Sequence, residues 1–242
     1  MRIDSLDLIK NKKALDELPK GKLMINTINT YSYTVARRNN EFEAALNASG
    51  ALLPDGQGIV LACKFINGRS KPTERVTGWD LFSHEMEELN RRGGKCFFMG
   101  CSEKTLSTIR EKAKETYPDI TVETFSPPYK DTFDEDDNRL MVDAINRARP
   151  DLLWIGMSAP KQEKWLAANW DRLDIDCHAG SIGAVFSFFA GTEKRAPEFW
   201  CRHGLEWLYR FIHDPRRLWP RYVTGNLRFA RYLLAEKFHH AK

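Results

Sequence analysis

The sequence predicts an α/β protein: a Rossmann-like parallel sheet flanked by helices, followed by a helical, basic C-terminal appendage. Short apolar segments alternate along the chain with helix-like segments of about 10 to 15 residues, which is the pattern of βαβ units. Several apolar segments end in glycine directly before a helix. Because the last fifth of the chain differs in composition, we expect a core over residues 1–194 and the appendage over residues 195–242.

Apolar patterning and helix-boundary residues place the elements. We expect strands at 22–28, 51–53, 95–99, 120–125, 151–155 and 175–179, and helices at 31–47, 58–65, 78–92, 102–117, 135–149 and 160–170. A glycine-led turn and a buried helix are expected over 180–189. Asn29 or Thr30 suits the N-cap of the first helix. Gly93-Gly94 ends the third helix, and Pro54-Asp55-Gly56 has the residues of a turn.

The expected appendage is basic and aromatic. Residues 195–242 hold ten Lys or Arg and four Asp or Glu, a net +6, whereas the other 194 residues sum to −2 within the total of +4. Ten of the 28 aromatic residues also lie there. Such a surface suits anionic lipid or single-stranded nucleic acid. The third interpretation, a packed helix pair with a solvated Arg face, is the one that composition alone favours.

Spacing adds detail to this segment. Five residues follow a 4-3-4-3 series that predicts one helical face: Arg217, Arg221, Thr224, Arg228 and Arg231. Asp214-Pro215 suits the start of a helix. Pro220 predicts that the helical stretch is kinked or split.

The bulk properties indicate a cytosolic, globular protein. We find no secretory signal pattern. The longest weakly polar run, about 181–191, is far shorter than the roughly 20 residues of a membrane-spanning helix. The five cysteines are scattered and form no C-x-x-C pair, which favours reduced thiols over disulfides or a zinc site.

Ligands of parallel sheets bind beyond the carboxyl ends of the strands. Six residues are expected there: Thr27, Asn29, Asp55, Gly100, Gly156 and Gly180. Asp55 can act as a general base for a nearby hydroxyl, and Gly56 lets a ligand approach the backbone. The alternative, which this string alone favours, is an ordinary Asp-Gly turn. For Asn29 the alternative is helix capping.

Two further strings suit phosphate. In the string 156–163, a helix start attracts anions, Lys161 adds charge and Gln162 adds an amide. The string 180–183 ends in Gly183 and resembles a phosphate-binding turn, although it is not a dinucleotide fingerprint. The D-x-D string 174–176 precedes its strand and so lies at the wrong end for a site. We therefore expect no required metal and no cofactor.

Several short strings follow one another along the chain: Thr27-x-Asn29, Asp55-Gly56-x-Gly58, Arg75-Val76-Thr77-Gly78, Pro160-Lys161-Gln162-Glu163, Gly191 with Arg195-Ala196-Pro197, Gly204 through Arg210, Pro215-Arg216-Arg217 and Arg221-Tyr222. Together they resemble the WecG/TagA/CpsF glycosyltransferases, family 26. They occur in the family's order from about Leu23 to Leu234. Each string alone is weak evidence for the family, but the ordered set is specific to it. The set therefore reverses the preference for a simple turn at Asp55.

The resemblance implies a metal-independent, inverting hexosyl- or N-acetylhexosaminyltransferase of the bacterial cytoplasm. It would transfer a sugar from a UDP-sugar to a polyprenyl-diphosphate-linked saccharide in teichoic acid, capsule or exopolysaccharide synthesis. Asp55 is the implied base, with Thr27 beside it. The implied substrate-binding residues are Asn29, Gly56, Arg75, Lys161, Gln162 and Gly183. The implied contacts to the UDP phosphates or to the membrane are Arg210, Arg217 and Arg221. At position 187 this chain has Ser, where many members of the family have Asp.

The resemblance also implies partners. These are the UDP-sugar, the lipid-linked acceptor, the inner face of the cytoplasmic membrane and a second copy of the chain, but no nucleic acid. Two alternatives remain: an α/β protein that binds nucleotides without transferring a sugar, and a nucleic-acid binder that acts through the C-terminal segment.

Overall fold

The computed structural model describes residues 1–202 and 204–239 and contains one six-stranded sheet. The strands are β1 (Leu23–Ile28), β2 (Ala51–Pro54), β3 (Gly94–Gly100), β4 (Ile120–Phe125), β5 (Leu152–Gly156) and β6 (His178–Ser181). All neighbouring pairs are parallel, in the order β2-β1-β6-β5-β3-β4. The predicted α/β class with a parallel sheet is thus confirmed.

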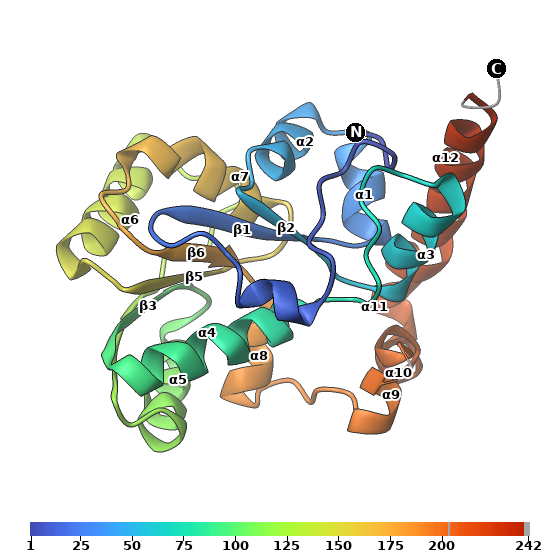
Figure 1. The fold of residues 1–242 in the computed structure, drawn as a ribbon. Coiled ribbons are helices and arrows are strands. Elements are labelled where there is room, and N and C mark those ends of the chain that lie inside the picture. Colours follow the sequence, from blue (N-terminus) through green and yellow to red (C-terminus); the bar gives the residue numbers. More distant parts are fainter. Residues whose placement is uncertain (203, 240–242) are drawn as a thin grey trace.

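Helices cover both faces of this sheet (Figure 1). Up to residue 190 they are η1 (Lys12–Leu15), α1 (Thr30–Ala36), α2 (Asn40–Asn47), α3 (Gln57–Ile66), α4 (Gly78–Arg92), α5 (Glu103–Thr116), α6 (Glu135–Ala148), α7 (Lys161–Asn169), η2 (Trp170–Arg172) and α8 (Gly183–Ala190). Side chains alternate along each strand, so Phe98 packs under α4, α5 and α8, whereas Phe97 packs under α6 and α7. Ligands of such sheets bind beyond the carboxyl ends of the strands, so the candidate site is described at that edge.

Two predicted elements were placed wrongly. The helix expected at 31–47 is two helices, because Asn39 has extended backbone and its side chain accepts a hydrogen bond from the N–H of Phe42, which starts α2. The strand expected at 175–179 begins later, at His178, and extends to Ser181, so that Gly180 lies inside it. A side chain at Gly180 would collide with the ring of Trp154, 2.4 Å from its ideal Cβ. Gly180 therefore serves close packing inside the sheet.

The C-terminal segment consists of short helices and one long one. It contains α9 (Glu198–Arg202), α10 (Glu206–His213), α11 (Pro215–Trp219), the π-helical η3 (Pro220–Thr224) and α12 (Gly225–His239). The predicted split at Pro220 is confirmed, and consequently the 4-3-4-3 series is not carried by one regular helix. The side chains of Arg217 and Arg221 lie outside the described part of the structure.

α12 packs against α1 and α3 (Figure 1). Phe229 is 7% exposed and joins Tyr33, Phe42 and Ile59 in one apolar cluster. The boundary expected at residue 194 stays a prediction, but α12 on its far side packs into this core. No helix among the described residues has the length and apolar character needed to span a bilayer.

Candidate active site

The ends of β1 and β2 bring Thr27, Asn29 and Asp55 together. Thr27 pairs with Leu53 and Ile28 with Pro54, so Asn29 and Asp55 are the next residues beyond the paired strands. The N–H of Asp55 donates to the carbonyl of Ile28 at 2.8 Å, which holds the turn against β1. Thr27 and Asp55 are both half-buried. The predicted group therefore lies at the carboxyl edge of the sheet.

Gly56 makes the turn after Asp55 possible. Its φ of +131° lies in a region that favours glycine, and an ideal Cβ there would lie 3.8 Å from the Cβ of Asn29. α3 begins immediately afterwards, at Gln57, without a side-chain cap. The partial positive charge of this helix start thus lies beside Asp55.

Asn29 caps α1, as the alternative interpretation had it. Its Oδ1 accepts from the N–H groups of Tyr31 and Ser32, and the Ser32 hydroxyl accepts from the N–H of Asn29. The cap fixes the oxygen of Asn29 towards the helix. The amide nitrogen remains the group for the predicted contact to substrate.

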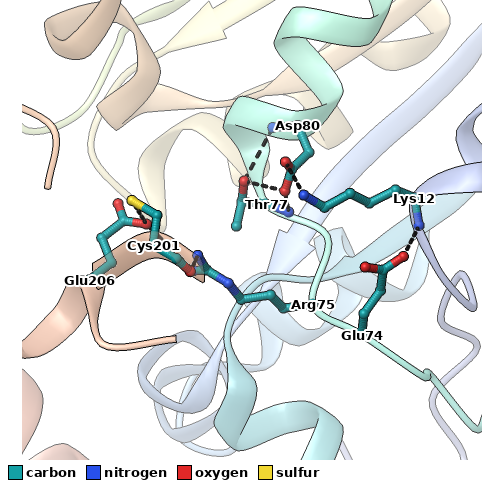
Figure 2. A network of polar contacts seen from close by, with 7 residues as sticks. All are labelled: Lys12, Glu74, Arg75, Thr77, Asp80, Cys201 and Glu206. Atoms are coloured by element: carbon teal, nitrogen blue, oxygen red, sulfur yellow. Dashed lines mark hydrogen bonds and ion pairs between the residues drawn. The ribbon is translucent and has the colours of Figure 1, made fainter. Parts of the chain in front are cut away.

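Arg75 connects this edge to the C-terminal segment (Figure 2). The loop that carries it is held by the N–H of Val76, which donates to Pro54 O at 3.0 Å. The Arg75 guanidinium donates to the carbonyl of Cys201 and lies 3.5 Å from Glu206. Its side chain is only 18% exposed.

The turn between α9 and α10 lies on the Asp55 loop. An ideal Cβ on Gly204 would be 3.5 Å from the Cβ of Gln57. α9 and α10 therefore form a cover beside Asp55.

Gln162 and Gly183 meet between the ends of β5 and β6. Gln162 is 5% exposed, and its Oε1 accepts from the N–H groups of Met157 at 3.2 Å and Gly183 at 3.0 Å. A side chain at Gly183 would place Cβ 2.1 Å from Met157 O. Both residues thus brace the two strand ends, and the N–H of Gly183 is engaged within the protein.

Glu163 is the most buried carboxyl of this edge, at 2% exposure. One of its oxygens accepts from Gln162 Nε2 at 2.8 Å, and burial raises its pKa above the ordinary 4.5. The other oxygen has no partner among the described residues. The neighbouring Lys161 turns away: its Nζ donates to Lys130 O and lies 3.6 Å from the ring centroid of Phe133. Burial lowers the pKa of Lys161.

Arg210 lies on the other side of the cover. Its guanidinium is 3.9 Å from Glu193 and 5.5 Å from the ring centroid of Phe188. Of the three predicted arginines it is the one whose side chain is described. Arg210, on α10, therefore contacts α8 through Phe188 and the loop after α8 through Glu193. This loop joins the core to the cover.

Sequence reasoning missed Arg195 and Glu206 as parts of the site. Arg195 stacks over Trp79 at 4.8 Å, and its buried Nε has no partner within the described residues. Glu206 pairs with Arg75. Both lie within strings already noted, but only long-range contacts reveal their surroundings.

The D-x-D string lies away from this edge, as expected. Asp174 and Asp176 both precede β6, at the amino end of the sheet, and the N–H of Asp174 donates to Asn146. Among the residues that the structure describes, no three His, Cys, Asp or Glu side chains are grouped to hold a metal ion.

A carboxylate, an arginine and an uncapped helix start thus lie at the carboxyl edge of a parallel sheet, which is the edge where α/β proteins bind their ligands and where helix starts attract phosphate. Comparison with known proteins gives the family. The model of the "Glycosyl transferase WecG/TagA/CpsF family" matches residues 1–242, and the chain belongs to this family.

Curated relatives carry the name N-acetylglucosaminyldiphosphoundecaprenol N-acetyl-beta-D-mannosaminyltransferase. The protein from Bacillus spizizenii strain W23 is 32% identical over 203 residues, covering 81% of this chain and 75% of the relative. The protein from Bacillus subtilis strain 168 is 29% identical over 201 residues, covering 83% and 75%. One from Staphylococcus aureus strain MW2 is 26% identical over 198 residues, covering 82% and 75%. The resemblance inferred from the sequence is thus confirmed.

Proposed function

We propose that this glycosyltransferase moves an N-acetylhexosamine from a UDP-sugar to a polyprenyl-diphosphate-linked saccharide, with inversion, in bacterial surface polysaccharide synthesis. The names of the relatives support the sugar class and the lipid-linked acceptor. The observation that carries the proposal is the position of Asp55, held by Ile28 O beside Asn29 and the start of α3.

In this mechanism Asp55 accepts the proton of the acceptor hydroxyl. The hydroxyl oxygen attacks the anomeric carbon from the face opposite UDP, a new C–O bond forms, and UDP leaves with the electrons of the broken C–O bond. The departing diphosphate gains negative charge. The start of α3 and three arginines of the C-terminal segment, Arg210, Arg217 and Arg221, stabilise that charge. Thr27 and Asn29 orient the sugar.

The proposal includes the C-terminal segment. Residues 1–194 form the catalytic core, and residues 195–242 complete the site and meet the inner face of the cytoplasmic membrane. Four large apolar side chains support the membrane contact, since each is more than 40% exposed: Phe199, Trp207, Ile212 and Trp219. Arg217 and Arg221 belong to the same surface in this proposal, and self-association stays a prediction.

Asp55→Asn tests the base. We expect turnover to fall by about 10²–10⁴-fold, with UDP affinity unchanged, because the amide cannot accept the proton but keeps the shape of the turn. UDP release and product mass are measured with UDP-sugars and a short-chain polyprenyl-diphosphate N-acetylglucosamine. Asp174→Asn, at the opposite edge of the sheet, is the matched control. Near-normal turnover of Asp55→Asn would contradict the base assignment.

The same assay separates the alternative of a non-transferase nucleotide-binding protein. That protein would bind UDP but release none of it from any UDP-sugar offered with the acceptor. Membership of a glycosyltransferase family favours transfer.

A further inference from the structure

A surface pocket of about 330 Å³ lies between α1 and α12. α1 contributes Tyr31, Thr34 and Val35, the residues between α1 and α2 contribute Arg38 and Asn39, and α12 contributes Gly225 and Arg228. This volume lies within the usual range of small-molecule sites.

The pocket is positively charged. Arg38 and Arg228 both line it, and none of its lining residues carries a carboxylate. Within the described part of the chain neither arginine has an ion-pair partner, whereas the neighbouring Arg37 pairs with the buried Glu236 and donates to Met1 O at 2.7 Å. Two guanidinium groups in one pocket repel each other unless an anion lies between them.

The other polar groups suit the same ligand. Asn39 uses its Oδ1 to accept from the N–H of Phe42 at 2.9 Å, so its amide NH₂ is the group left to donate. Tyr31 adds a phenol. Arginine forks and amide donors match the oxygens of a phosphate group.

The walls of the pocket are fixed. The rings of Tyr33 on α1 and Phe229 on α12 meet edge to face at 5.4 Å between centroids. Glu236 accepts hydrogen bonds from the Tyr33 hydroxyl and from the N–H of Ile3. The packing of α1 on α12 thus fixes the backbone from which the exposed side chains of Arg38 and Arg228 project.

The inner end of the pocket adjoins the Asp55 loop. Thr30 Oγ1 donates to Asn226 Oδ1 at 2.8 Å, and these residues directly precede Tyr31 and follow Gly225. An ideal Cβ on Gly58 would lie 2.5 Å from Thr30 Cγ2. α1 rises about 8 Å from Tyr31 to its last residue, Ala36. Arg38 follows beyond that end, so the arginine end of the pocket holds a group displaced from the reacting hydroxyl.

We propose that this pocket binds the diphosphate of the lipid-linked acceptor, an inference that rests on the proposed function. The acceptor sugar lies against Asp55 because Asp55 takes its proton. The diphosphate is attached at the far end of that saccharide. The α1–α12 pocket provides two arginines that have no ion-pair partner among the described residues, at such a displacement and next to the same loop.

The test uses Arg38→Ala and Arg228→Ala in the full chain, with Arg231→Ala, an exposed arginine of α12 outside the pocket, as the control. Binding of farnesyl-diphosphate-linked N-acetylglucosamine and of inorganic pyrophosphate is measured by calorimetry. KM is measured separately for this acceptor and for the UDP-sugar. Flotation with phosphatidylglycerol and phosphatidylcholine vesicles reports on headgroup binding.

We expect each pocket variant to bind the acceptor and pyrophosphate about tenfold more weakly than the wild type, as for the loss of one charge-assisted hydrogen bond. The acceptor KM should rise in parallel, with the UDP-sugar KM and the Arg231→Ala variant unchanged. The proposal is overturned if the pocket variants bind the acceptor as tightly as the wild type. It is also overturned if they lose only binding to phosphatidylglycerol vesicles, or if only the KM for the UDP-sugar rises.

Failure of the proposed function gives a different result. In that case the wild-type protein transfers no sugar at all, which overturns the acceptor assignment. A tenfold loss of pyrophosphate binding in Arg38→Ala then still supports an anion site in the pocket.

Discussion

The two ends of the C-terminal segment are attached to the molecule by different kinds of contact. α12 buries Phe229 and Glu236, at 7% and 5% exposure, against α1 and the N-terminal residues. α10 has no buried residue. Its described attachments include the pairing of Arg75 with Glu206, beside the hydrogen bond from Arg75 to Cys201 O (Figure 2).

This difference separates a fixed part from a cover. Burial of large apolar side chains contributes about 1.5–3 kcal/mol each, whereas a partly exposed ion pair contributes about 0–1 kcal/mol. Elements held by few buried contacts open at low free energy. We therefore expect α9 and α10 to open over the Asp55 loop while α12 stays in place.

The largest expected effect is on the fixed part. Glu236→Ala leaves the Tyr33 hydroxyl and the Ile3 N–H buried without an acceptor, so the free energy of unfolding should fall by about 3 kcal/mol. Urea denaturation measures it. Glu111→Ala, on an exposed helical surface, should change stability by less than about 0.5 kcal/mol. A loss below about 1 kcal/mol for Glu236→Ala would show that α12 is not locked to the core.

The next effect is local and concerns the cover. Arg75→Ala should lower global stability by no more than about 1 kcal/mol, yet speed amide hydrogen exchange in α10, because both contacts of the guanidinium are lost. Exchange in α12 should stay unchanged. Arg91→Ala, which removes an exposed pair with Glu88, is the control. An equal increase in α12 would contradict the separation of the two parts.

The smallest effect lies outside the C-terminal segment and concerns the pH dependence of stability at Glu163 on α7, which packs on the sheet. Burial raises the pKa of Glu163, so folding favours its protonated form. Its stabilising contribution is fully present below the ordinary pKa of 4.5 and is lost as pH rises through the raised folded-state value. Glu163→Gln removes this titration. The stability of the variant relative to wild type should therefore increase as pH rises through that window, as followed by urea denaturation at several pH values.

A stability difference between the two proteins that is constant from pH 4 upward would contradict the assignment. Glu87→Gln, on α4, is a control for the substitution itself.

Local patterns predicted much of the fold. The capping box of Thr77 and Asp80 starts α4 where the sequence predicted a helix, and Asp55 follows an apolar strand as expected. The prediction failed at β6, whose residues His178–Ser181 include no β-branched side chain. Pairing with β1 and β5 makes this segment a strand, and only Gly180 leaves room for the ring of Trp154.

The sequence by itself determined the family, the parallel sheet and the place of Asp55 at a strand end, because these depend on local composition and ordered strings. Only the tertiary structure decided that Arg75 contacts Cys201 and Glu206, that Gln162 braces two strand ends, and that α1 and α12 flank a pocket lined by two arginines. Those features join residues far apart in the chain. Their contacts arise only when the apolar core has brought the elements together.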